Sequence, residues 1–195
     1  MSERSLEALE AALAMLSRPQ LARLARRSSL PRGVTLLLEV AAGEPEALEE
    51  ARKLTGRPEA LLRQAASFFM EQVLLTRKAD SYRVLGAGSG ATPAELRRHM
   101  ALILKGLHPD RVSPGGEARH FDMSALAGLV TAAWENLKTG ERRAAYDASR
   151  KSEVEKPGLG AGAASIGSAT RRLALYRIER EPLWTRLLIY LGRFK

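Results

Sequence analysis

The 195-residue sequence contains no cysteine and only three histidines. Without cysteine, the chain cannot form a disulfide, a thiol nucleophile, an iron–sulfur cluster or a zinc site built on thiolates. Three histidines alone are a poor basis for a metal cage. We therefore expect no metal and no cofactor.

The sequence also lacks a long hydrophobic run. A membrane-spanning helix needs roughly 18 or more uncharged apolar residues, and no stretch reaches that length. Glu3, Glu7 and Glu10 interrupt the N-terminal region where a signal peptide requires an apolar core. We therefore expect a cytoplasmic protein. Its 45% hydrophobic residues are enough to bury a globular core, although only 5% are aromatic.

The net charge of +9 is unevenly distributed along the chain. Residues 1–79 and residues 80–150 each carry a surplus of +2, whereas residues 151–195 carry +5. A nucleic-acid-binding domain concentrates its basic residues on one element of the fold. Nucleic acid is therefore not an expected partner.

Residues 1–79 have the pattern of successive helices. Leu6, Leu9, Leu13 and Leu16 recur at helical spacing, and the apolar run 34–42 suits a short buried helix. The pattern G-x-P-E-A-L occurs at 43–48 and again at 56–61, with glycine suited to closing one helix and proline to opening the next. We predict a helix from Pro58 to about Arg77. These segments form a predicted helical N-terminal domain.

Residues 80–150 predict two further helices joined by an exposed loop. Thr92-Pro93-Ala94-Glu95 has the form of a capping box, so a helix begins near Pro93. Its buried stripe is predicted to be Leu96, Met100, Ile103 and Leu107. The opposite face is centred on Arg98 and Lys105, with Ala101 and Leu102 between them and Arg97 to one side.

The loop begins where this helix must stop. Pro109 cannot continue the helix and disfavours helical geometry at His108, so His108-Pro109-Asp110 lies in a turn. A second helix is predicted from about Phe121 to Lys138, with its apolar stripe facing the first. His99 lies at the edge of the buried stripe and is expected to be structural.

This segment resembles a J domain, the module that recruits and activates DnaK-type heat-shock ATPase chaperones. The resemblance covers residues 80–150 and rests on Tyr82-Arg83-Val84-Leu85-Gly86, the helix from Pro93 to Leu107, His108-Pro109-Asp110 with Arg111, Ala133-Trp134-Glu135-Asn136-Leu137, and Glu141-Arg142-Arg143-Ala144-Ala145-Tyr146-Asp147. Neither zinc-binding repeats nor a Gly/Phe-rich region accompanies it, as in the minimal class of J proteins.

The resemblance implies a co-chaperone and not an enzyme, because it is the partner ATPase that hydrolyses ATP. His108, Pro109 and Asp110 would dock on the ATPase, with Asp110 accepting a hydrogen bond from a partner arginine. The resemblance also implies that the basic set Arg97, Arg98, Lys105 and Arg111 binds the partner's acidic surface. Ala101 and Leu102 stand where the family usually has Lys or Arg, which leaves open an adaptor with weak or lost activity.

One rival interpretation concerns Gly86-Ala87-Gly88-Ser89-Gly90, which imitates the phosphate loop of dinucleotide-binding folds. Such a loop needs flanking strands, and the sequence indicates none. The favoured role is a flexible connection into the following helix.

The C-terminal part is predicted to be a linker over residues 151–172, followed by a basic amphipathic helix over 173–195. The Leu183–Leu191 stripe of this tail has three candidate fates: packing within the protein, contact with an anionic membrane surface, or binding of a protein partner. The expected architecture is therefore all-α: an N-terminal domain (1–79), a J domain (80–150), the linker and the tail. Client or targeting proteins would bind residues 1–79 or the tail.

Overall fold

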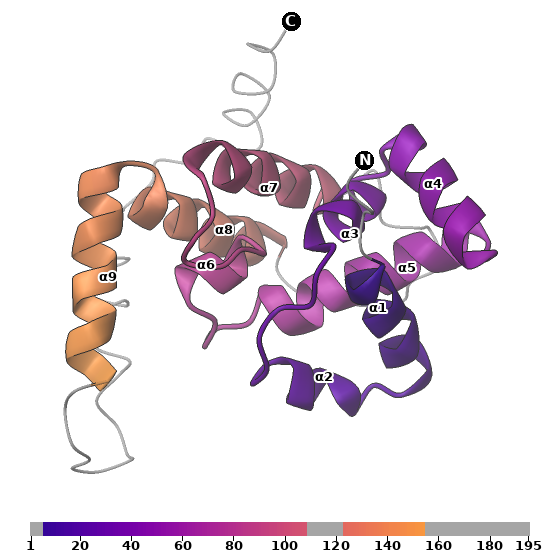
Figure 1. The fold of residues 1–195 in the computed structure, drawn as a ribbon, viewed down its shortest axis with the longest axis horizontal. Helices are drawn as coiled ribbons and strands as arrows, with labels where there is room; N and C mark the ends of the chain where they lie inside the picture. The colour runs from indigo at the N-terminus through magenta and orange to yellow at the C-terminus, as the bar shows by residue number, and fades with distance from the viewer. Residues whose placement is uncertain (1–5, 109–122, 155–195) are drawn as a thin grey trace, which may run out of the picture. The chain divides into compact units, whose positions relative to one another are not determined.

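The computed structural model describes residues 6–108 and 123–154. These residues form nine α-helices and one π-helical turn, and they contain no strand, which confirms the all-α prediction (Figure 1). None of the described helices is long and apolar enough to span a bilayer. The predicted linker and tail lie outside the described residues.

The helices follow one another with short connections. Within residues 6–84 they are α1 (Glu7–Ser17), α2 (Leu21–Ala25), α3 (Val34–Ala41), α4 (Pro45–Thr55), α5 (Glu59–Phe69), the π-helix η1 (Met70–Leu74) and α6 (Ser81–Val84). They are followed by α7 (Pro93–Gly106), α8 (Met123–Leu137) and α9 (Gly140–Val154).

The junctions around α4 form as their residue types predict. Pro45 lies in the first turn of α4, and Gly56 closes the helix with a left-handed φ of 65°. The apolar run before this junction is helical, so the prediction for residues 34–42 is confirmed by α3. The helix predicted to reach Arg77 is shorter: its α-helical part ends at Phe69, and a π-helical turn extends it to Leu74.

The core joins the N-terminal helices to the segment that resembles a J domain. Helices α1 and α3 pack on α5, and α7 packs on both α3 and α8, while α6 packs on α8. Large, fully buried side chains come from both parts of the chain: Leu9, Leu36, Leu37, Leu38, Leu62, Phe69, Met70 and Leu74 from the first, and Leu85, Leu96, Ile103 and Leu137 from the second.

The chain divides into two compact units, residues 1–149 and residues 150–195. The predicted boundary between residues 79 and 80 falls inside the first unit. Of the second unit, the structure describes only residues 150–154, the last residues of α9.

Candidate functional site

Helix α7 ends just before the His-Pro-Asp sequence. Its first turn forms the predicted cap, because the Thr92 hydroxyl accepts the backbone N–H of Glu95 at 3.1 Å. Its last turn closes at Gly106, after which the His108 N–H donates to the Lys105 carbonyl at 3.3 Å. His108 is half-buried. Pro109, Asp110 and Arg111 lie outside the described residues.

The three predicted basic residues of α7 have different surroundings. Arg97 is exposed, and the described part of the chain shows no partner for its guanidinium. Arg98 donates to Glu39 of α3, although its own side chain remains 60% exposed. Lys105 donates to Glu44, the residue that precedes α4, at 2.6 Å. Two of the three cations are therefore ion-paired with acids of the N-terminal helices.

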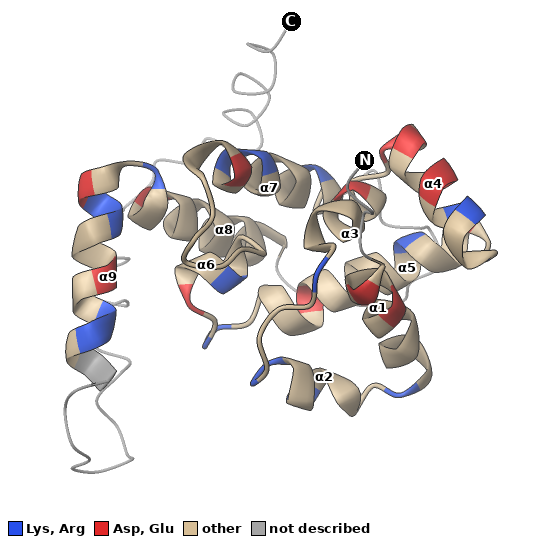
Figure 2. Cartoon of the chain, viewed as in Figure 1, with Lys and Arg blue, Asp and Glu red and all other residues tan. Residues whose placement is uncertain are grey.

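These acids differ in their access to solvent. The Glu39 side chain is 6% exposed, whereas that of Glu44 is 36% exposed. In Figure 2 the positions of acidic residues are coloured along α4 and those of basic residues on α7. The N-terminal part of the chain thus places negative charge against two of the basic residues predicted to bind the partner, Arg98 and Lys105.

The prediction for Leu102 is wrong. Sequence periodicity placed it on the exposed basic face, but it is only 8% exposed. Arg98, Leu102 and Gly106 form one stripe of α7, because they are four residues apart. Arg98 reaches Glu39, and a Cβ on Gly106 would lie 3.4 Å from the Ala41 carbonyl, so both ends of this stripe face α3. Leu102 is buried because α7 has a second packed face toward α3.

His99 ties three parts of the core together, which confirms its structural role. Its Nδ1 lies 3.0 Å from the Leu85 carbonyl, and its Nε2 lies 2.9 Å from the Thr35 hydroxyl. Because a carbonyl can only accept, Nδ1 carries the proton and Nε2 accepts from Thr35. Burial lowers the pKa of His99 below its ordinary value of 6.5, so the neutral ring is favoured.

Helix α9 is held to α6 by a polar cluster around Tyr82. The Tyr82 hydroxyl donates to Asp147 at 2.9 Å and accepts from Arg143 Nε at 2.9 Å. The ring of Tyr146 meets the ring of Tyr82 edge-on, and the Tyr146 hydroxyl accepts the Ser81 N–H at 2.7 Å. Burial, reinforced by the bond to Asp147, raises the pKa of Tyr82. These contacts hold α9 in place, and α9 carries the last segment of the resemblance, Glu141–Asp147.

The glycine-rich loop is held as a connection between helices. Tyr82–Val84 lie in α6 and not in a strand, which argues against a dinucleotide site. Arg143 Nη1 donates to the Ala91 carbonyl at 2.7 Å, and its Nη2 donates to the Ser89 carbonyl. Within the described residues there is also no group of three side chains placed to hold a metal ion.

The residues missed by sequence reasoning are the acids Glu39 and Glu44. Their only signal was weak: Glu39 is the single charged residue of the apolar run 34–42. A lone acid in a buried helix needs a partner, and that partner cannot be identified from periodicity.

Comparison with known proteins supports the resemblance for part of the chain. The chaperone protein DnaJ of Rhodobacter capsulatus is 37% identical over 70 residues, which cover 36% of this chain and 17% of that protein. DnaJ of Acetivibrio thermocellus is 32% identical over 90 residues, covering 46% and 22%. DnaJ of Leifsonia xyli subsp. xyli is 32% identical over 119 residues, covering 52% and 31%.

The chain thus spans less than a third of the length of these relatives. No protein-family model matches it. No solved structure matches it either. The described residues are all helical, and this architecture together with the partial similarity to DnaJ chaperone proteins is consistent with a J-domain protein.

Proposed function

We propose that this chain is a J-domain co-chaperone that docks on a DnaK-type ATPase and stimulates its ATP hydrolysis. The observation that carries the proposal is that α7 ends at Gly106, so that one residue separates it from the sequence His108-Pro109-Asp110. The similarity to DnaJ chaperone proteins supports the same partner. No catalytic group is required of this chain.

Each docking residue has a chemical role in this proposal. Pro109 fixes the turn, His108 anchors it, and Asp110 accepts a charge-assisted hydrogen bond from an arginine of the ATPase. Arg97, Arg98, Lys105 and Arg111 supply positive charge that steers the partner's acidic surface toward the turn. Arg97 is the exposed member of α7 without a described partner, so it is the cation most ready for this role.

Single-turnover ATP hydrolysis by the cognate DnaK-type chaperone tests the proposal. We expect the full chain to accelerate hydrolysis, and Asp110→Asn to abolish the acceleration because the amide cannot form the charged hydrogen bond. Asp122→Asn is the matched control, since it removes an equal charge from a nearby part of the sequence. Equal acceleration by all three proteins would overturn the proposed role of Asp110.

An adaptor that binds a DnaK-type chaperone without stimulating it is the second candidate. The pairing of Arg98 with Glu39 and of Lys105 with Glu44 favours it, because partner acids would have to compete with these internal ones. Leu102, buried against the N-terminal helices, offers the partner no charge. Binding of the unaltered chain to the ATPase without any acceleration of hydrolysis would support this candidate.

Client and location are further parts of the proposal. Residues 1–79 are a proposed client or targeting region, although several of their helices contribute to the common core. The tail, 173–195, is proposed to bind a partner or an anionic membrane surface, or else to pack within the protein. Co-sedimentation with anionic liposomes that is unchanged on deletion of residues 173–195 would reject membrane attachment through the tail.

A further inference from the structure

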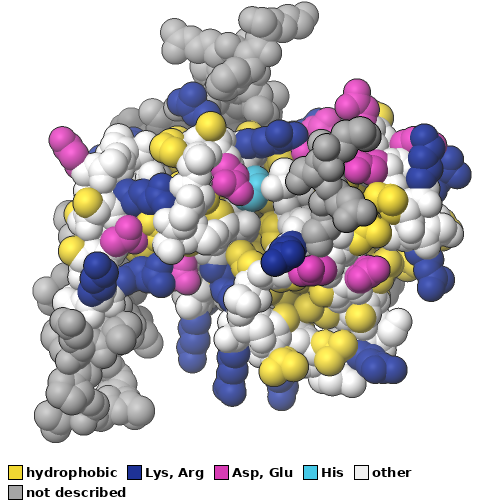
Figure 3. Space-filling model, in the orientation of Figure 1, with side chains coloured by type: hydrophobic (Ala, Val, Ile, Leu, Met, Phe, Trp, Pro, Cys, Tyr) yellow, Lys and Arg dark blue, Asp and Glu magenta, His cyan; other side chains and the backbone are white. Residues whose placement is uncertain are grey.

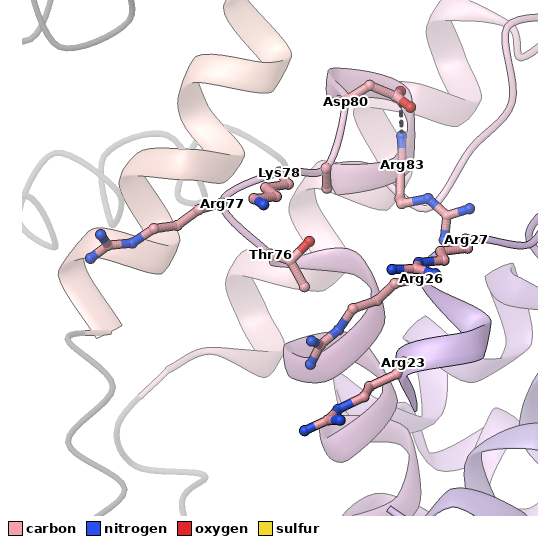
Figure 4. Close-up of a pocket in the computed structure, with 9 residues that line it drawn as sticks. Arg23, Arg26, Arg27, Thr76, Arg77, Lys78, Asp80 and Arg83 are labelled. Atoms are coloured by element: carbon pink, nitrogen blue, oxygen red, sulfur yellow. Dashed lines mark hydrogen bonds between the residues drawn. The ribbon is translucent and has the colours of Figure 1, made fainter. Parts of the chain in front are cut away.

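A basic pocket opens between α2 and the chain that joins η1 to α6. It has a volume of about 600 Å³ and is lined by six cationic side chains and one acidic one. We call it the α2 pocket; its lining is Arg23, Arg26, Arg27, Thr76, Arg77, Lys78, Ala79, Asp80 and Arg83 (Figure 4). These residues as a group are part neither of the segments that resemble DnaJ nor of the proposed docking turn, His108-Pro109-Asp110.

Two of the arginines build the frame of the pocket. Arg26 donates through Nη2 to the Gln72 side chain at 2.8 Å and through Nε to the Gln72 carbonyl at 2.5 Å, and these bonds connect the residue after α2 to η1. Arg83 donates to the carbonyls of Ala25 and Ser28, tying α6 to the end of α2. The two cations are therefore held in place while still contributing positive charge.

The other four cations have no such ties. Among the described residues, the side chains of Arg23, Arg27, Arg77 and Lys78 have no hydrogen-bond or ion-pair partner, and all four residues are exposed. In Figure 4, Arg23 and Arg26 extend side by side from α2, whereas Arg77 points away from them. The one acid, Asp80, uses its Oδ1 to accept the Arg83 N–H at 3.1 Å, where it caps α6.

This cluster of cationic side chains is suited to binding a multivalent anion. Like charges gathered on one surface repel one another, and an anion bound between them removes that cost. Arginine forks match the oxygen geometry of phosphate and can bind it with two parallel hydrogen bonds. The chemistry of the α2 pocket therefore fits phosphate groups.

The surface next to the pocket indicates where those phosphates come from. Leu24 lies between Arg23 and Arg26 in the sequence and is 66% exposed. Figure 3 shows hydrophobic side chains over α2 beside projecting Lys and Arg side chains. An apolar side chain flanked by cations suits the headgroup region of a membrane. Aromatic platforms for stacking bases are absent from the lining of the pocket, which disfavours single-stranded nucleic acid.

We propose that the α2 pocket binds the phosphate groups of anionic phospholipids, with Leu24 entering the headgroup region beside them. Phosphates are held by Arg23, Arg27 and Lys78 on the frame set by Arg26 and Arg83. This contact uses residues far in sequence from the tail 173–195 and is independent of the docking turn.

The absence of cysteine allows a local test on the full chain. Leu24→Cys is labelled with an environment-sensitive fluorophore and mixed with vesicles of equal parts phosphatidylglycerol and phosphatidylcholine. We expect a blue-shifted, brighter signal that is lost with pure phosphatidylcholine or with high salt. Arg23→Gln with Arg27→Gln should weaken vesicle binding about twenty-five-fold, because each basic side chain near an anionic surface contributes roughly a factor of five.

Leu54→Cys provides the matched control for the label. Leu54 is 52% exposed and also lies beside cations, but its neighbours Arg52 and Lys53 pair with Glu49. Lys53→Gln with Arg57→Gln is the matched control for charge. Circular dichroism verifies that each variant keeps its helical content. We expect no signal at position 54 and little loss of binding in this charge control.

Three outcomes would overturn the proposal. The first is an unchanged label at position 24 while the vesicles bind, which would assign the contact to another part of the chain. The second is a response of that label to inorganic pyrophosphate but not to vesicles, which would assign the pocket to a soluble phosphate. The third is a response that depends on Arg23 and Arg27 but requires an RNA or DNA oligonucleotide instead of lipid.

Discussion

At the scale of single residues, His99 makes the core sensitive to acid. Its ring bonds Leu85 and Thr35 in the neutral form, and burial lowers its pKa below the ordinary value of 6.5. The folded state therefore resists protonation, whereas the unfolded chain takes up a proton near pH 6.5. The stability that depends on neutral His99 is present above pH 6.5 and is lost as the pH falls below it.

Urea unfolding at a series of pH values measures this effect. We expect the free energy of unfolding to decrease as the pH falls from about 7.5 to about 5.5, on either side of the ordinary histidine pKa. His99→Gln should lower the stability at neutral pH and flatten this pH dependence, because the titrating group is gone. A pH dependence equally steep in the variant would contradict the assignment to His99.

Gly86 is a residue that no side chain can replace without strain. Its φ is +64°, and a Cβ at this position would lie 2.9 Å from Cγ1 of Val34. We expect Gly86→Ala to destabilise the protein by about 1–2 kcal/mol from the left-handed backbone alone, with a further cost for moving Val34. Gly88→Ala is the control, since a Cβ there meets nothing within 4 Å. Equal unfolding midpoints in urea for the two variants would show that the loop adapts.

At the scale of helices, periodicity predicted which segments are helical better than which faces are buried. Three residues of the predicted stripe, Leu96, Ile103 and Leu107, are buried, whereas the fourth, Met100, is half-buried. Leu102 is buried as well, because α7 packs on α8 and also on α3. A helical pattern with one charged face predicts a single buried face. The second buried face of α7 packs on α3, which lies about 60 residues earlier in the chain and is not visible in the pattern of α7 itself. The π-helical turn at Met70–Leu74 likewise has no signature in the spacing of apolar residues.

The contact between Lys105 and Glu44 has a consequence for docking. If the ATPase uses Lys105, the ion pair with Glu44 must open first, and a part-exposed pair of this kind is worth up to about 1 kcal/mol. We expect Glu44→Gln to tighten binding to the DnaK-type chaperone by about two- to fivefold, as the pair's worth allows. Titration of the partner by fluorescence anisotropy measures the change.

The control for this prediction is Glu46→Gln. Glu46 is exposed on the first turn of α4, so the variant changes the net charge equally without freeing Lys105. Equal tightening by both variants would mean that net charge, and not release of Lys105, controls the affinity. Glu39 is unsuited to the same test, because it is buried and its replacement would disturb the core.

At the scale of the whole molecule, the N-terminal helices and residues 80–107 share one core. Thr35 bonds His99, Glu39 bonds Arg98, and Ala41 lies against Gly106. The sequence motifs were sufficient to predict helix α7 and the helix α8 that packs on it, because the start of α7 depends on local capping and proline chemistry. The predicted turn at Pro109 and Asp110 lies outside the described residues. The motifs contained no information on what covers α7. That contact arises only when the apolar faces of α1, α3 and α5 come together.

The proposed co-chaperone function concerns the whole chain, and single-turnover ATP hydrolysis by the cognate DnaK-type chaperone tests this proposal most directly. We expect acceleration by the full chain and by Asp122→Asn, and none by Asp110→Asn, because in the proposed mechanism Asp110 is the residue that accepts a hydrogen bond from the partner's arginine. A full chain that leaves the hydrolysis rate unchanged, or an Asp110→Asn variant that accelerates it as well as the unaltered chain does, would contradict the proposed function.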